Sequence, residues 1–298
     1  MTISERPSST PFAVPALTGI SSLAGRYDAL VCDLWGVVHD GIVPYGSAVD
    51  ALIRFRAGGG RVVLLSNAPR PRGSVAAQLA RIGVDRRAWD AIVSSGDLTR
   101  AELAVRAGAK VHHIGPDRDL AIFEGLDVSL VRLEEAQALV CSGLDDDEAE
   151  APDDYRDRLE TALARKLPML CANPDRRVMR GDRAVYCAGA IAELYEGMGG
   201  DVTWLGKPYP KAYAMVEAVL AELPGGAVPR SRLLAVGDGI HTDIAGARDA
   251  GIDAVLVTGG LHAEEFGDTA HAPDAARVAK ICAGIGARPV GFLARLAW

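Results

Sequence analysis

Short, wholly apolar runs alternate along this chain with segments whose apolar residues recur at helical spacing, and this alternation restricts the folds open to it. Residues 29–32 and 62–65 are runs of the kind found in strands buried on both faces. Between them, residues 48–55 have helical periodicity, and three consecutive glycines follow that end a helix. A third run at 91–93 continues the pattern. Strands that alternate with helices in this way predict a parallel sheet with helices on both faces.

The same alternation returns near the C-terminus, after a segment with a different pattern of apolar and polar residues. Apolar runs at 233–236 and 254–257 flank a helical pattern, and a run at 202–205 precedes them. Between about 108 and 200 the apolar runs are shorter, and an acidic run at 145–148 is typical of a solvated loop. One doubly wound domain interrupted by an inserted domain is the simplest account of this order.

We therefore predict an α/β fold with a doubly wound, Rossmann-like parallel sheet core and a large inserted α/β cap domain. A chain of 298 residues is long enough for about two domains. The predicted parts are an N-terminal arm at 1–19, a core domain at 20–107 and 201–298, and a cap domain at 108–200.

Composition narrows the class of partner. The chain has 39 acidic and 32 basic residues and a formal net charge of −7, which disfavours nucleic-acid and membrane partners because both require a basic stripe. No stretch has the apolar length of a membrane span or a signal peptide. The five cysteines are scattered without a CxxC pair, which argues against a zinc ribbon or a disulfide framework. We expect free thiols and a cytoplasmic protein.

Polar side chains follow the predicted strands at their carboxyl ends, where an open parallel sheet binds its ligands. Taken singly, such residues have ordinary explanations, since an acid there is often a helix N-cap and a lysine before proline is usually on the surface. Their occurrence at four strand ends indicates instead one site with carboxylates, a lysine and a hydroxyl. The residues concerned are Asp33, Ser66, Asn67, Lys207, Asp238, Thr242 and Asp243.

These residues fall into motifs by which the chain resembles the haloacid dehalogenase-like hydrolases. The resemblance covers about residues 27–260 and is to the class IIA branch, which contains p-nitrophenyl-phosphate, pyridoxal-phosphate and nucleotide or sugar phosphatases. The separation between Asn67 and Lys207 resembles the large α/β cap of that branch. The matching motifs are Asp-Leu-Trp-Gly-Val at 33–37, Leu-Ser-Asn at 65–67, Gly-Lys-Pro at 206–208, Gly-Asp-Gly at 237–239 with Thr-Asp at 242–243, and Ala-Asn-Pro-Asp at 172–175.

The resemblance implies a Mg²⁺-dependent phosphomonoester hydrolase. Asp33 would be the nucleophile that attacks phosphorus and forms an aspartyl-phosphate. Mg²⁺ prefers oxygen ligands, and Asp33, Asp238 and the backbone carbonyl of Trp35 would supply them. Asp243 would act on the metal directly or through a water.

The same resemblance implies how the substrate would be held. The Ser66 hydroxyl and the Asn67 backbone N–H would bind phosphate oxygens, and Lys207 would neutralise charge on the nucleophile and the transferring group. Asn173 and Asp175 would reach from the cap and read the substrate, although an Asn-Pro turn with a capping Asp explains them equally well. The partner would be a small phosphorylated metabolite, and a homodimer is possible.

Trp35 departs from the family pattern. Phosphatases of this group usually carry a second acid two residues after the nucleophile, which protonates the leaving group and then activates water. An indole cannot do this work, and losing such a group typically costs on the order of 10²–10⁴ in rate.

Three alternatives follow from this departure. Another group on the flap, such as His39 or Asp40, substitutes for the acid, or the protein is a slow phosphatase. In the third, it is a catalytically impaired protein that binds phosphate esters, or a metal-independent 2-haloacid dehalogenase. The presence of both Asp238 and Asp243 argues for Mg²⁺ and against the dehalogenase.

Overall fold

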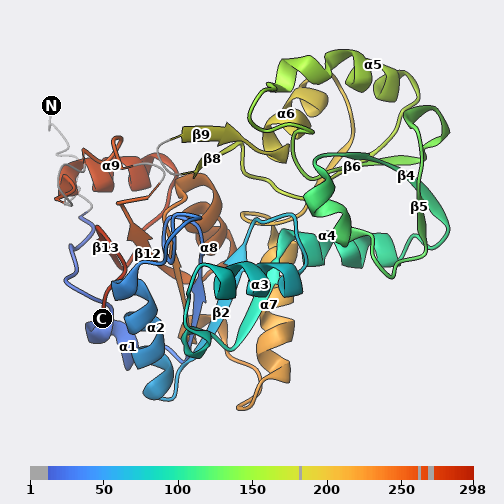
Figure 1. The fold of residues 1–298 in the computed structure, drawn as a ribbon. Helices are drawn as coiled ribbons and strands as arrows, with labels where there is room; N and C mark the ends of the chain where they lie inside the picture. Colours follow the sequence, from blue (N-terminus) through green and yellow to red (C-terminus); the bar gives the residue numbers. More distant parts are fainter. Residues whose placement is uncertain (1–12, 181–182, 261–262, 268–271) are drawn as a thin grey trace, which may run out of the picture.

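The computed structural model describes residues 13–180, 183–260, 263–267 and 272–298. Of the predicted N-terminal arm, residues 1–12 therefore lie outside the described residues. The described chain contains a six-stranded sheet, a five-stranded sheet and a separate two-stranded hairpin (Figure 1). No helix within these ranges combines the length and the apolar character that crossing a membrane requires.

The larger sheet is parallel throughout and forms the predicted Rossmann-like core. Its strand order is β13–β12–β11–β1–β2–β3, so the chain winds outward in both directions from β1. The point beside β1 where the winding reverses is where ligands bind in open sheets of this kind. The strands are β1 (Ala29–Cys32), β2 (Arg61–Ser66), β3 (Ala91–Ser94), β11 (Leu233–Gly237), β12 (Asp253–Val257) and β13 (Gly291–Leu293).

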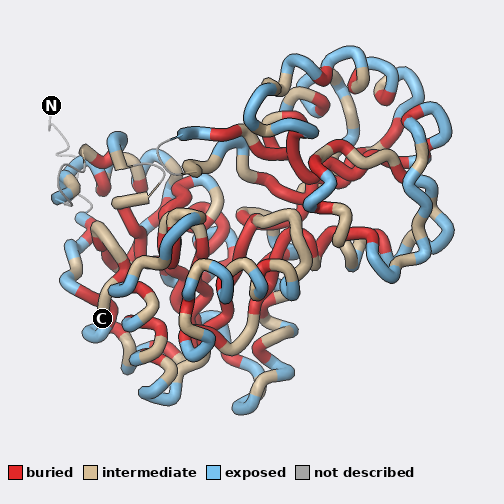
Figure 2. Tube along the Cα trace, viewed as in Figure 1, coloured by how far each residue is buried: buried red, intermediate tan, exposed pale blue. Residues whose placement is uncertain are grey.

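Helices cover both faces of this sheet, because successive strand side chains point to opposite sides. In β1, Ala29 and Val31 belong to one hydrophobic cluster, and Leu30 and Cys32 belong to the other. Figure 2 shows the strands as the buried layer between exposed helix surfaces. The first cluster takes in α4 (Ser95–Ala104), α7 (Pro210–Glu222), α8 (Ala245–Ala250) and α9 (Ala275–Gly284), and the second takes in α1 (Ser21–Ala24), α2 (Gly46–Ala57) and α3 (Arg72–Arg81). The doubly wound α/β prediction is confirmed.

The smaller sheet is also parallel and has the order β10–β7–β6–β4–β5. One of its faces packs on its own helices, α5 (Arg156–Ala164) and α6 (Ala188–Gly197). The other face shares the first hydrophobic cluster of the core, through Val111, Val140 and Leu170, so the two sheets are joined by apolar packing. The strands are β4 (Ala109–Ile114), β5 (Val128–Leu130), β6 (Ala138–Cys141), β7 (Met169–Cys171) and β10 (Val202–Trp204).

The run at 202–205 was expected to resume the core, and the structure corrects this. Its strand β10 pairs with β7 at the edge of the smaller sheet. In the core, β1 is flanked by β2 and β11, and β10 instead forms the edge of the smaller sheet beside β7. An apolar run shows that a strand forms but not which sheet it joins, so the smaller sheet extends past the predicted cap boundary at 200.

The hairpin consists of the antiparallel strands β8 (Arg177–Arg180) and β9 (Arg183–Tyr186). It leaves the smaller sheet after β7 and reaches toward the core (Figure 1). The hairpin thereby supplies a wall to the space between the two sheets.

Candidate active site

The carboxyl ends of three neighbouring core strands bring together the first group of predicted site residues. Asp33 directly follows β1, Ser66 ends β2 and Asp238 directly follows β11. All three are buried, yet they line a cavity of about 710 Å³ whose remaining walls come from the smaller sheet and the hairpin. The topological switch point of the core therefore forms the floor of this cavity.

Lys207 lies at the centre of the charge arrangement. Its Nζ donates to Asp33 Oδ1 at 2.6 Å and to Asp243 Oδ1 at 2.7 Å. Burial alone would lower the pKa of this lysine, but the charges of Asp243 and Asp33 outweigh it and raise the pKa well above its ordinary value. Lys207 is therefore a fixed cation. It arrives from the end of β10, in the smaller sheet, and not from a core strand as the sequence predicted.

Three carboxylates form the one cluster suited to a metal ion among the residues that the structure describes. Asp33, Asp238 and Asp243 offer oxygen atoms that all lie within 4.8 Å of one another, and all three residues are buried. Burial raises the pKa of Asp33, and burial together with the charge of Asp33 raises that of Asp243. A divalent cation would relieve this repulsion, and an all-oxygen donor set suits Mg²⁺ or Ca²⁺.

Glycines make room for these carboxylates. A Cβ placed on Gly36, whose φ is +80°, would lie 2.2 Å from Asp238 Oδ2, and one on Gly260 would lie 1.8 Å from the same atom. The Gly239 N–H donates to Asp243 Oδ2 at 3.0 Å. The other oxygen of Asp243, Oδ1, accepts a hydrogen bond from Lys207 Nζ. This carboxylate is therefore held by the backbone on one side and orients the lysine on the other.

Asn67 connects the core to the lysine segment and to the cap. Its Nδ2 donates to the Lys207 carbonyl at 3.1 Å and to Asp175 Oδ1 at 2.8 Å. Its Oδ1 accepts from the Lys207 N–H at 2.7 Å. The backbone N–H of Asn67 was predicted to serve the site, and in the structure its side chain also fixes where Lys207 and Asp175 lie.

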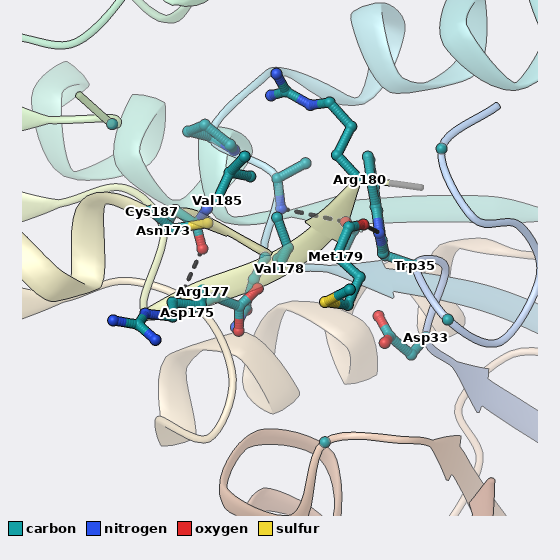
Figure 3. Close-up of a pocket in the computed structure, with 18 of the residues that line it drawn as sticks. Asp33, Trp35, Asn173, Asp175, Arg177, Val178, Met179, Arg180, Val185 and Cys187 are labelled. Carbon is teal, nitrogen blue, oxygen red and sulfur yellow. Dashed lines mark hydrogen bonds between the residues drawn. The ribbon is translucent and has the colours of Figure 1, made fainter. Parts of the chain in front are cut away.

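Trp35 lines the cavity and spans from the core to the hairpin. Its Nε1–H donates to the Met179 carbonyl at 2.5 Å, and Figure 3 shows the indole beside this strand. The ring packs edge-on against His39, and a Cβ on Gly41 would lie 2.4 Å from the indole. The residue at the position of the usual acid is thus a contact between the two parts of the molecule.

His39, the predicted substitute for that acid, is poorly placed for the task. It is buried and is not among the residues that line the cavity. Its Nδ1 accepts from the Gly41 N–H at 2.9 Å, and burial lowers its pKa to about 4. A histidine that is neutral at pH 7 and shut off from the cavity cannot protonate a leaving group there, so the structure speaks against this expectation.

Asn173 and Asp175 both line the cavity, as Figure 3 shows. Asn173 Oδ1 accepts from the Asp175 N–H at 3.0 Å, which is the turn that the sequence offered as the plain alternative. The structure therefore has the turn and also brings Asp175 to the site, through its contact with Asn67.

Two arginines at the outer part of the cavity, Arg118 and Arg180, were given no role by the sequence, and residues 145–148 were expected to be solvated. Arg118 and Arg180 each donate to Asp147 Oδ2 at 2.6 Å. The Asp147 side chain is 10% exposed and lines the cavity, so that expectation is wrong for this residue. Its partners come from distant parts of the chain, and no local pattern in the sequence signals such a pairing.

The parallel core carries a buried carboxylate paired with a lysine, beside an acidic cluster at its switch point, and this arrangement fits an enzyme with an α/β Rossmann-like core. A family model described as haloacid dehalogenase-like hydrolase matches residues 30–129, and a second, HAD-like hydrolase model matches residues 204–282. A solved hydrolase of the haloacid dehalogenase-like family from Brucella suis 1330 is 41% identical, with 95% of this chain and 100% of that chain covered and a TM-score of 0.84. The chain belongs to the haloacid dehalogenase-like family.

A curated relative and a second solved structure come from Mycobacterium tuberculosis. The relative is a D-glycerol 3-phosphate phosphatase, 29% identical over an alignment of 255 residues, with 82% of this chain covered. The match spans 66% of the length of that relative, somewhat less than two thirds. The solved structure is a glycerol phosphate phosphatase in complex with magnesium, 25% identical, with 80% of this chain and 70% of that chain covered and a TM-score of 0.63.

Proposed function

We propose that this protein is a phosphomonoester hydrolase that acts on a small organic phosphate through an aspartyl-phosphate on Asp33. The observation that carries the proposal is the ion pair between Asp33 and Lys207, at 2.6 Å, on the floor of a cavity with two further carboxylates. Family membership and the phosphatases among the relatives support it. We also propose the class IIA branch, with a core and a cap that enclose the substrate.

Asp33 and Lys207 have different roles in the reaction at phosphorus: Asp33 is the nucleophile, and Lys207 stabilises charge. One oxygen of Asp33 is held by the lysine, which leaves the other to attack phosphorus in line with the leaving oxygen. The fixed charge of Lys207 then stabilises the negative charge that builds up on the transferring group. Ser66, with its hydroxyl at the end of β2, and the Asn67 N–H would hold phosphate oxygens.

A divalent cation fits the donors present. Asp33 and Asp238, with the Trp35 carbonyl, would hold Mg²⁺, and Asp243 would act directly or through a water. When bound, such an ion neutralises the phosphate and the nucleophile so that two anions can approach.

The test is phosphate release from p-nitrophenyl phosphate and from glycerol 3-phosphate. We expect Asp33→Asn to abolish release and EDTA to suppress it until Mg²⁺ is restored. The control is Asp153→Asn. The Asp153 carboxylate lies in the cap and forms a largely exposed ion pair with Arg156, so this variant should keep its activity. Activity that survives Asp33→Asn refutes the mechanism, and tight binding of phosphate esters without release would identify a binding protein instead.

A further inference from the structure

The proposed reaction needs a proton donor for which the structure has no obvious residue. An alkoxide is a strongly basic leaving group and departs far more readily when it is protonated as the P–O bond breaks. Trp35 has no titratable group, and its N–H is engaged with Met179. His39 does not line the cavity. The donor must be sought among the carboxyl groups that do.

Most of those carboxyl groups have other partners. Asp33 and Asp238 belong to the metal-suited cluster. Asp40 Oδ1 accepts from two backbone N–H groups of its own loop. Asp147 is paired with two arginines, and Asp119 lies 4.0 Å from Arg70. Asp175 is different, because no ion pair involving it is found within the part of the chain that the structure describes and its carboxylate is held by the side chain of Asn67, whereas that of Asp40 is held by its own loop.

Asp175 is held in place by one oxygen and leaves the other open. Its Oδ1 accepts from Asn67 Nδ2 at 2.8 Å, while no hydrogen bond to Oδ2 is found among the described residues. The backbone around it is fixed as well, since its N–H donates to Asn173 Oδ1 and its carbonyl accepts from the Gly189 N–H at 3.1 Å. The residue lines the cavity and is partly accessible from it.

A short chain of contacts places Asp175 near the reacting atoms. Asn67 donates to both Asp175 and the Lys207 carbonyl, and Lys207 donates to Asp33. The charge of Asp175 acts on Asp33 and on Lys207. Figure 3 shows Asp175 and Asp33 as lining residues of the same pocket, with the Met179 side chain between them in this view.

We propose, on the basis of the proposed function, that Asp175 is the general acid and then the general base of the reaction. In the first step Asp33 forms a bond to phosphorus, the ester P–O bond breaks, and the Asp175 carboxyl gives its proton to the departing oxygen. In the second step a water molecule attacks phosphorus through its oxygen, and the Asp175 carboxylate takes a proton from that water. The bond from phosphorus to Asp33 then breaks, which releases inorganic phosphate and restores both carboxyl groups to their starting states.

The environment of Asp175 supports this assignment. Burial raises the pKa of this carboxyl, an effect opposed by the charge of Lys207 and the hydrogen bond from Asn67 and reinforced by the charge of Asp243. A raised pKa keeps more of the acid form at neutral pH, as a proton donor requires. The group reaches the site from the cap, so it completes the active site only when the cap lies over the core.

The experiment compares Asp175→Asn with wild type on two esters. Asparagine keeps the shape and the acceptor for Asn67 but cannot transfer a proton. Glycerol 3-phosphate releases an alkoxide, and we expect its turnover to fall on the order of 10²–10⁴-fold. p-Nitrophenolate leaves without a proton, so the variant should still form the aspartyl-phosphate and give a burst of one nitrophenolate per site before slow turnover.

Two further variants make the result decisive. Asp119→Asn alters another buried carboxyl of the cavity, and we expect the ratio of the two activities to stay as in wild type. Asp33→Asn should give neither burst nor turnover, which tests the proposed function separately. Equal losses on both esters without a burst, or undiminished turnover of glycerol 3-phosphate in Asp175→Asn, would overturn the assignment. A wild-type protein that hydrolyses neither ester would overturn both proposals.

Discussion

Replacement of Trp35 by phenylalanine tests whether the indole holds the hairpin over the cavity. Phenylalanine keeps an aromatic ring against His39 and Gly41 but removes the N–H that donates to the Met179 carbonyl at 2.5 Å. A single hydrogen bond contributes about 0.5–1.5 kcal/mol net. At about 1.4 kcal/mol for each factor of ten, this corresponds to a roughly 2- to 12-fold shift away from the closed hairpin.

The measurement is the steady-state kinetics of p-nitrophenyl phosphate hydrolysis. We expect KM to rise within that range while kcat changes less, because the contact helps to enclose the substrate but does not touch the reacting atoms. The matched control is Trp204→Phe, which removes an indole N–H bonded to Glu196 at 3.1 Å within the smaller sheet region. An unchanged KM in Trp35→Phe, or an equal rise in Trp204→Phe, would refute the reasoning.

Two further predictions concern stability. Mg²⁺ should raise the Tm of wild type and leave that of Asp238→Asn unchanged in thermal melts at matched ionic strength, since a ligand at 100 times its Kd stabilises by about 2.7 kcal/mol. Burial raises the pKa of Tyr27 to about 12, and a hydrogen bond of 2.7 Å from its hydroxyl to Asp253 contributes to this rise. Because the unfolded pKa is about 10, this stabilisation is complete below pH 10 and is lost between pH 10 and 12. Urea unfolding should therefore show a steeper loss over that interval in wild type than in Tyr27→Phe, and parallel curves would contradict the assignment.

The core could be predicted because its signals are local. Each buried parallel strand is a short apolar run, and the residue that follows it must lie at the ligand-binding edge. Asp33, Ser66 and Asp238 could be placed together for this reason alone, and the structure puts them on one cavity floor. The roles of these residues remain predictions that the experiments above address.

The remaining features depend on contacts between distant segments. The pairing of β10 with β7 in the smaller sheet is such a contact, and an apolar run does not show which sheet its strand joins. Trp35 was recognised as a departure, but its partner is a backbone carbonyl of the hairpin, and a carbonyl has no sequence signature. His39 is close to the motif in sequence, but in the structure it is buried and packs edge-on against the Trp35 indole.

The origin of Lys207 in the smaller sheet bears on how the molecule can open. The lysine follows β10 by three residues, so it sits on one of the two chain segments that link the sheets, the other being the connection from α4 to β4. A rotation of the smaller sheet about these links would carry the hairpin outward while Lys207 stayed close to the axis. Product could then leave past the hairpin without separating the ammonium from Asp33, and the charged centre would be ready for the next molecule of substrate when the hairpin returned.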